Sequence, residues 1–116
     1  MEFDLNNKIF RSVSNTENSE VGSETLFLYH QENEKIWAEY SGGTIVKGHL
    51  LGKVLSSGRF EFLYHHINLD GDLMVGKCLS TPEALSDGRL RMIEEWKWLC
   101  GDKSIGTSEL MEVLYE

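Results

Sequence analysis

The chain is poor in basic residues, cysteine and proline, and it has no long apolar run. Its 11 Lys and Arg residues stand against 19 Asp and Glu, a formal net charge of −8. A protein with this excess of negative charge repels phosphate backbones, so we expect no nucleic-acid partner. The longest apolar runs reach only a few residues, far short of the roughly 20 that span a bilayer, so we expect no membrane association. With no basic start followed by an apolar stretch, no signal peptide is visible, and the composition favours a cytoplasmic protein.

The two cysteines, Cys78 and Cys100, are too few for a metal framework. Neither has a second cysteine at zinc spacing, and the last histidine in the chain is His66, so we expect reduced thiols, no metal site and no cofactor. Motifs of common catalytic sites are missing too: there is no Gly-x-Ser-x-Gly elbow, no phosphate loop and no His-Glu-x-x-His. No motif therefore identifies an enzyme.

What the chain does contain is enough apolar material for one core. Hydrophobic residues make up 41% of its 116 residues and charged residues 26%, a balance typical of a folded domain rather than a disordered chain. A domain of this length buries roughly 65% of its unfolded surface without disulfides or metals. We therefore expect residues 1–116 to form a single domain.

Glycines and polar turns recur at regular intervals and divide the chain into eight candidate strands. The predicted strands are 7–13, 24–31, 36–40, 44–55, 59–68, 73–80, 89–99 and 105–114. Short turns between them predict an antiparallel meander, and eight strands can close into a small barrel without free edges. An open two-layer sandwich has the same local signals. We predict an all-β fold, a single eight-stranded, antiparallel, mostly up-and-down β-barrel, with an irregular loop at 81–85.

Two Asp-Gly pairs, at 70–71 and 87–88, are the strongest turn signals, because a type I′ hairpin turn needs positive φ at both central residues. If both form two-residue turns, Tyr64 faces Lys77 and Lys77 faces Trp98, so side chains of three strands gather on one face. That face holds the predicted ligand-binding residues Tyr64, His66, Lys77, Glu94 and Trp96. A one-residue change in either turn would flip a strand. The alternative face then holds His65, Cys78, Arg91 and Glu95.

Glu94 is the most informative single residue of the predicted face. It shares that face with Trp96 and Trp98, and a carboxylate on an apolar wall needs a partner or a raised pKa. It could be a polar anchor or a general acid inside a ligand cavity. Alternatively, it could lie near the barrel mouth, in water or paired with Lys77 or Lys47.

Several short stretches, taken together, resemble a family of small bacterial proteins often labelled N-acetylglutamate synthase. The stretches are Asn7-Lys-Ile-Phe10, Ser14-Asn-Thr-Glu-Asn18, Ser23-Glu-Thr25, Tyr40-Ser-Gly-Gly43 with Ile45-Val-Lys-Gly-His49, Gly76-Lys-Cys78, Glu94-x-Trp-x-Trp98 and Gly106-Thr-Ser108. In architecture the predicted barrel is similar to the calycin type, which includes lipocalins, avidin and fatty-acid-binding proteins. Binding acetyl-CoA would need oriented backbone N–H groups or a basic cluster for the pyrophosphate. The chain offers neither, so we expect no acetyl-CoA-dependent acetyltransferase.

Three functions are compatible with the pattern. The leading hypothesis is a non-catalytic protein that holds a small, partly apolar molecule inside the barrel, because ligand pockets are mostly apolar with a few polar groups. The second is a lipocalin-like enzyme of decarboxylase or isomerase type that uses Glu94 beside Tyr64. The third is a filled barrel that acts as a homodimeric interaction module. Monomer and homodimer both stay open at this point.

Overall fold

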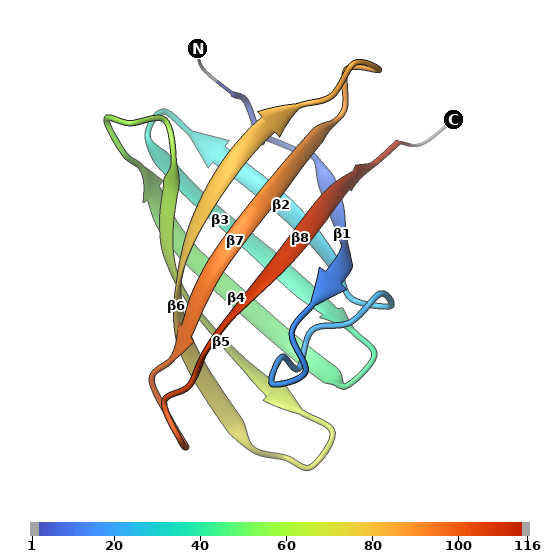
Figure 1. The fold of residues 1–116 in the computed structure, drawn as a ribbon, viewed down its shortest axis with the longest axis vertical. Coiled ribbons are helices and arrows are strands. Elements are labelled where there is room, and N and C mark those ends of the chain that lie inside the picture. Colours follow the sequence, from blue (N-terminus) through green and yellow to red (C-terminus); the bar gives the residue numbers. More distant parts are fainter. Residues whose placement is uncertain (1–2, 115–116) are drawn as a thin grey trace.

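The computed structural model describes residues 3–114, which form a closed barrel of eight antiparallel strands (Figure 1). Each strand pairs with its neighbour in the sequence, and the last strand pairs with the first. The strands are β1 (Ile9–Asn15), β2 (Leu26–Glu32), β3 (Lys35–Gly42), β4 (Ile45–Val54), β5 (Phe60–Asn68), β6 (Leu73–Ala84), β7 (Leu90–Trp98) and β8 (Ile105–Val113). The predicted eight-stranded, up-and-down barrel is therefore confirmed, and its closure excludes the open sandwich.

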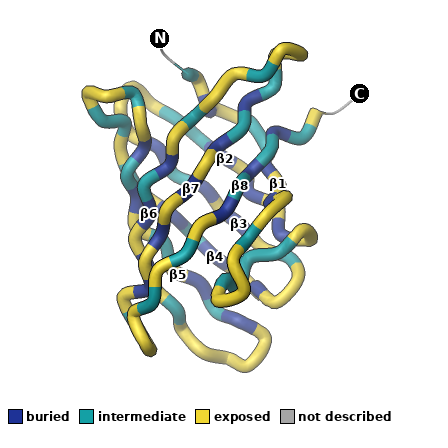
Figure 2. The backbone as a smooth tube through the Cα atoms, viewed as in Figure 1, coloured by how far each residue is buried: buried dark blue, intermediate teal, exposed yellow. Residues whose placement is uncertain are grey.

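Alternating side chains give the barrel one interior and one exterior, visible in Figure 2 as buried and exposed segments that alternate along the strands. In β7, Met92, Glu94, Trp96 and Trp98 are buried, and the residues between them are exposed. Successive side chains of a strand point to opposite faces of the sheet. The chain therefore places these four side chains on the inner wall.

Both Asp-Gly pairs lie in three-residue loops rather than in the predicted two-residue turns. In the β5–β6 hairpin, the Asn68 N–H donates to the Asp72 carbonyl at 3.1 Å, and the Gly71 N–H donates to the Asn68 carbonyl at 2.9 Å. Only the glycine of the pair has positive φ, which matches a type I turn followed by a left-handed glycine. The β6–β7 hairpin repeats this arrangement at residues 85–89.

The extra loop residue shifts each predicted register by one and reverses the two faces of β6. Tyr64 pairs with Gly76 and not with Lys77. Because the shifts at the two hairpins compensate, β5 and β7 keep the faces that were predicted for them. The prediction that Lys77 faces inward is wrong: Lys77 is exposed on the outside, and its neighbour Cys78 is buried on the inside.

Strand β6 also continues through residues that were predicted to form a loop. It pairs with β7 as far as Ala84, with Pro82 opposite Met92. Its pairing with β5 ends at Ser80, so beyond that residue one side of β6 has no strand beside it. Proline has no N–H to offer a neighbour and is tolerated at such an edge. The predicted irregular loop is therefore wrong for residues 81–84.

The two ends of the barrel are built differently. At the end where both termini lie (Figure 1), the interior is filled by side chains that are at most 1% exposed, namely Leu5, Phe10, Phe60, Met92 and Leu110. At the other end, the β1–β2 loop (16–25) lies over the mouth, where the Thr44 hydroxyl donates to the Glu20 carbonyl at 2.6 Å. An internal cavity lies in the half beneath the loop.

The described residues contain no helix long and apolar enough to cross a membrane.

Candidate functional site

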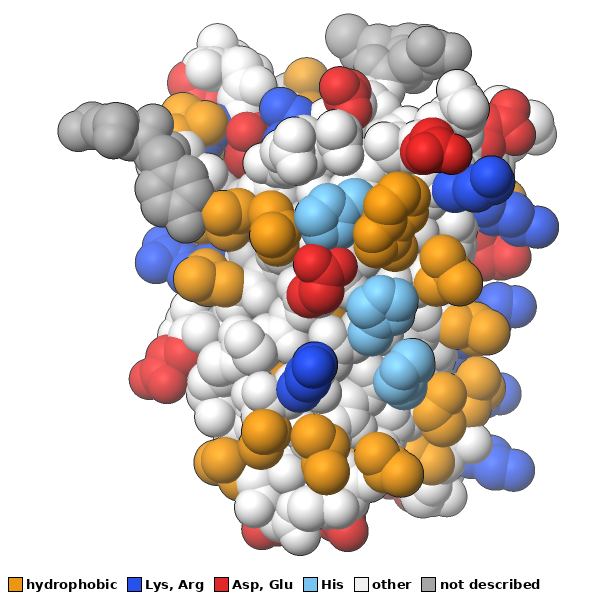
Figure 3. All heavy atoms as spheres, turned by 180° about the vertical axis from the view of Figure 1, so that it is seen from behind, with side chains coloured by type: hydrophobic (Ala, Val, Ile, Leu, Met, Phe, Trp, Pro, Cys, Tyr) orange, Lys and Arg blue, Asp and Glu red, His pale blue; other side chains and the backbone are white. Residues whose placement is uncertain are grey.

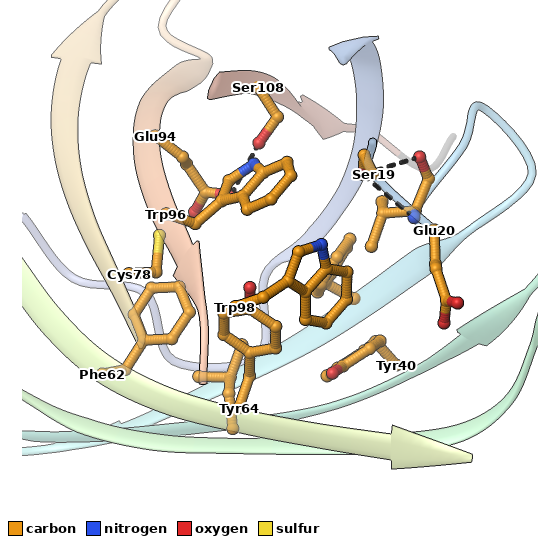
Figure 4. A pocket seen from close by; sticks show the side chains of 13 residues that line it. Ser19, Glu20, Tyr40, Phe62, Tyr64, Cys78, Glu94, Trp96, Trp98 and Ser108 are labelled. Atoms are coloured by element: carbon orange, nitrogen blue, oxygen red, sulfur yellow. Dashed lines mark hydrogen bonds between the residues drawn. The ribbon is translucent and has the colours of Figure 1, made fainter. Parts of the chain in front are cut away.

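A cavity of about 40 Å³ lies inside the barrel beneath the β1–β2 loop (Figure 4). One buried water needs roughly 10–15 Å³ of cavity volume, so the space suits a group of about three waters or a ligand of that size. Its apolar and aromatic lining consists of Val21, Phe27, Tyr40, Leu50, Phe62, Tyr64, Trp96 and Trp98. Its remaining lining residues are Ser19, Glu20, Cys78, Glu94 and Ser108. An apolar wall with a few convergent polar groups is the usual composition of a small-molecule pocket.

Three aromatic side chains of this wall lie against glycines of the neighbouring strand. The cross-strand pairs are Tyr40 with Gly48, Tyr64 with Gly76, and Trp96 with Gly106. A Cβ atom at any of these glycines would collide with the ring of its partner. The missing side chain therefore lets each ring cover the adjacent strand, as in aromatic rescue of a strand glycine.

Trp96 and Trp98 form the aromatic wall on β7. Their ring centroids are 5.6 Å apart, and Trp98 lies 5.7 Å from Tyr64, both in edge-to-face geometry. The indole N–H of Trp98 donates to the Asn18 carbonyl at 3.0 Å. A buried indole gains stability from such a hydrogen bond, so the aromatic wall and the loop above it hold each other in place.

Glu94 extends from β7 into the cavity and is only 6% exposed. The Ser108 hydroxyl donates to its Oε1 atom at 3.3 Å, whereas Oε2 has no hydrogen-bond partner in the described structure. The buried hydroxyls of Tyr29 and Ser80 have no partner there either, and Ser80 lies opposite Glu94 in the sheet. Buried polar atoms without partners cost free energy. This part of the wall can therefore bind a polar group of a ligand.

Burial also changes the pKa values of the ionisable side chains that line the cavity. It raises the pKa of Glu94 from 4.5 to about 7, because desolvation disfavours the carboxylate, while the nearby Ser80, Ser108 and Cys78 groups oppose the rise. Burial likewise raises the pKa of Tyr64 and of the Cys78 thiol, with the charge of Glu94 adding to each rise. Tyr64 and Cys78 therefore stay neutral near pH 7, whereas Glu94 can gain or lose a proton there.

A second polar cluster closes the mouth of the barrel. The Nε2 atom of His66 lies 2.8 Å from Glu20 Oε1, and its Nδ1 atom lies 2.9 Å from the Tyr40 hydroxyl. The Asn68 amide donates to the second Glu20 oxygen at 3.0 Å. The His66 side chain is fully buried and that of Glu20 is 26% exposed. Through these contacts the cluster fastens the β1–β2 loop to β5 and, through His66, to β3.

Four of the five residues predicted for the leading site point inward. Tyr64, Glu94 and Trp96 line the cavity, and His66 is buried at its mouth. Lys77 does not join them, for the register reason given above. The alternative that Glu94 pairs with Lys77 or Lys47 is wrong, because both lysines are exposed outside the barrel.

The alternative face is divided between the interior and the exterior. Cys78 lines the cavity, whereas His65 and Glu95 are exposed and Arg91 pairs with Glu109 at 2.6 Å. Figure 3 shows one outer face of the barrel, on which histidines lie among apolar and charged side chains. No group of three or more potential metal ligands occurs between residues 3 and 114.

Sequence reasoning missed four polar residues that line the cavity, Ser19, Glu20, Tyr40 and Ser108. Ser108 and Tyr40 could have been found from the period-two alternation of β8 and β3, which points both side chains inward. Glu20 had no such signal, because it lies in the polar β1–β2 loop, where no periodicity relates a residue to the barrel interior. Its contact with His66 joins residues 46 positions apart.

Comparison with known proteins gives one match. A family model described as Avidin-like protein matches residues 3–113, nearly the whole chain. Neither the search of curated proteins nor that of solved structures finds a match. The family match extends from the first described residues to the end of β8, and so includes every strand that contributes to the cavity.

Proposed function

We propose, from the premise that the chain belongs to the avidin-like protein family, that its barrel binds one small, partly apolar molecule in the cavity. The calycin-like fold predicted from the sequence agrees with this family and with the closed eight-stranded barrel. A barrel of eight strands is just wide enough to be filled by side chains or to hold one small ligand. In this chain buried side chains pack the half near the termini, and the proposed ligand site is the cavity beneath the β1–β2 loop.

One observation supports binding above all others: buried polar atoms without partners lie in or beside an aromatic cavity. Glu94 Oε2 and the Tyr29 and Ser80 hydroxyls have no hydrogen bond within the described chain. A core that only filled space would favour apolar side chains at these positions, because unsatisfied buried polar groups are destabilising. A ligand with a polar end and an apolar body would satisfy both parts of the wall.

Access to the cavity leads past the β1–β2 loop. Ser19, Glu20 and Val21 of this loop line the cavity, and the loop is attached to the barrel through Glu20 and through the Trp98–Asn18 hydrogen bond. Binding loops carried on a rigid scaffold are a common arrangement. We expect the loop to move outward when a ligand enters.

Native mass spectrometry of freshly purified protein tests the proposal and reports bound ligand and oligomeric state together. We expect an added small mass that is lost on denaturation. Ser108→Leu should prevent binding by placing an apolar side chain in the cavity, while Thr107→Leu, on the outer face of the same strand, should leave it unchanged. Equal occupancy in both folded variants would contradict the proposal.

A second candidate function is proton transfer, favoured by a specific observation. A general acid or base works best when its pKa lies near the working pH, and burial raises the pKa of Glu94 to about 7 beside the neutral Tyr64 hydroxyl. Such an enzyme would be of the decarboxylase or isomerase type. Incubating the molecule found by native mass spectrometry with fresh protein would separate the two functions. Glu94→Gln should abolish turnover in an enzyme, whereas a carrier shows no turnover at all.

The remaining expectations from the sequence concern oligomeric state, cellular location and enzymatic activity. A homodimeric interaction module would appear in the same mass spectra as a dimer without added mass. The two free thiols, Cys78 and Cys100, are in keeping with the proposed cytoplasmic location. The resemblance to proteins labelled N-acetylglutamate synthase stays a prediction, as does the proposal that the chain is not an acetyl-CoA-dependent enzyme.

A further inference from the structure

We propose that the cavity selects a small organic ammonium, whose N–H groups donate to Glu94 while its carbon atoms lie against the indole rings. This inference rests on the proposed function, because it names the ligand class of the same cavity. It is argued from the charge, the hydrogen-bonding capacity, the aromatic wall and the size of the site.

Charge is the first argument. Glu94 takes part in none of the ion pairs found within residues 3–114, and no Lys or Arg lines the cavity. The other lining carboxylate, Glu20, already has a partner in His66. Burying a carboxylate without a counter-charge is costly. A cationic ligand would supply the missing charge, whereas an anionic one would add a second uncompensated charge.

Hydrogen-bonding capacity is the second argument. Ser108 satisfies only the Oε1 atom of Glu94, and Oε2 is left as an acceptor without a donor. An ionised carboxylate only accepts hydrogen bonds, and an ammonium only donates them. Ser80 and Tyr29 do not line the cavity, so Glu94 Oε2 is the buried acceptor that the cavity presents. This oxygen suits a donor-rich head group.

The aromatic wall is the third argument. Trp96, Trp98 and Tyr64 line the same cavity as Glu94, as Figure 4 shows. The faces of such rings carry negative potential and attract cations, tryptophan most strongly. An alcohol or amide would gain the hydrogen bond to Glu94 without this second attraction. A protonated amine gains both.

Size limits the ligand further. A cavity of about 40 Å³ has room for about three waters, so in the described conformation it suits a molecule of about three or four heavy atoms. Ligands this small bind no tighter than the micromolar-to-millimolar range, so the test needs a method suited to weak binding. The indole N–H signals of Trp96 and Trp98 are suitable NMR reporters, and Trp37, stacked on His30 rather than lining the cavity, is an internal control.

The experiment compares three probes of one chain length, n-propylammonium, 1-propanol and propanoate, at pH 8 with the full chain. We expect n-propylammonium to shift the Trp96 and Trp98 signals saturably, about tenfold more tightly than 1-propanol, and propanoate to bind more weakly than either. Glu94→Gln should remove the preference for the ammonium. Glu95→Gln removes the same charge from the exposed face and should keep that preference.

Each other result overturns the inference. If 1-propanol or propanoate binds as tightly as n-propylammonium, the cavity binds small molecules but does not select cations, and the proposed function stands. If no probe shifts the signals, ammonium selection is refuted, and native mass spectrometry decides separately whether the cavity holds another molecule. If Glu94→Gln fails to fold, the original chain is compared at pH 8 and pH 5, because Glu94, with a pKa raised to about 7, is protonated at pH 5. The preference for n-propylammonium over 1-propanol should disappear at pH 5, and an unchanged preference contradicts the proposed contact.

Discussion

Replacing Glu94 with glutamine should increase the free energy of unfolding, relative to that of the original chain, more at pH 8 than at pH 4. The unfolded chain gives this carboxyl its ordinary pKa of 4.5, and burial raises the pKa to about 7 in the folded state. The folded state therefore holds the proton more tightly, so the free energy of unfolding falls as the pH rises from 4.5 to 7 and is level above that range. This rise of the pKa from 4.5 to about 7 corresponds to about 3 kcal/mol. Glutamine does not ionise and avoids this loss.

Urea denaturation at pH 4 and pH 8, followed by far-UV circular dichroism and tryptophan fluorescence, measures the effect. The stability of Glu94→Gln relative to the original chain should rise by about 3 kcal/mol between the two pH values, roughly 10 °C in melting temperature. The remaining ionisable groups are common to both proteins and cancel in the comparison. Tyr29, Tyr64 and Cys78, which face Glu94, have pKa values raised by burial and stay neutral throughout.

Glu95→Gln is the matched control, because Glu95 does not line the internal cavity and is exposed on the outer face of the same strand. Its relative stability should change little between the two pH values. If the relative stability of Glu94→Gln were the same at pH 4 and pH 8, Glu94 would not be held in a desolvated site, and the reasoning about its pKa would be refuted.

Four further predictions follow from the described contacts. Gly76→Ala should lower the free energy of unfolding by about 1–3 kcal/mol, because its Cβ collides with the Tyr64 ring; Gly22→Ala, which meets no atom within 4 Å, is the control in urea denaturation. Glu20→Gln should speed hydrogen exchange of residues 16–25 about fivefold, as expected for about 1 kcal/mol, and an unchanged rate would mean that the pair with His66 does not hold the loop. Lys77→Ala should leave ligand occupancy in native mass spectra unchanged, since Lys77 is outside the barrel; a loss would restore the predicted register. Calorimetric titration with acetyl-CoA should show no saturable binding, because the cavity lining includes two carboxylates and no basic side chain.

The sequence was sufficient for the strand count and for the inner faces of β5 and β7. Alternation with period two is a local property of a strand, so the burial of Phe62, Trp96 and Trp98 follows from the pattern of their neighbours. Glu94 could be recognised for the same reason. It shares its strand face with two tryptophans, and that relation does not depend on any other strand.

The register of β6 could not be obtained from the sequence, because a single residue in each hairpin loop decides it. Asp-Gly is compatible with a two-residue turn and with a three-residue loop that ends in a left-handed glycine, and both hairpins adopt the second form. This choice exchanges Lys77 for Cys78 in the cavity. The collision that a Cβ at position 76 would make with Tyr64 agrees with the observed register, but it is visible only once the two strands lie side by side.

By itself the sequence determined that this chain forms eight antiparallel strands with a carboxylate among aromatic side chains, because strand alternation and turn residues are local signals. Closure into a barrel rather than an open sandwich was decided by the tertiary structure, which pairs β8 with β1. Only the tertiary structure decided that Glu94 loses its contact with water and lacks a partner for Oε2. Only it placed Glu20 against His66, 46 residues away. Desolvation depends on every strand that surrounds a side chain, and a loop contact depends on where closure of the barrel brings the loop. Neither quantity is encoded in any short segment of the chain.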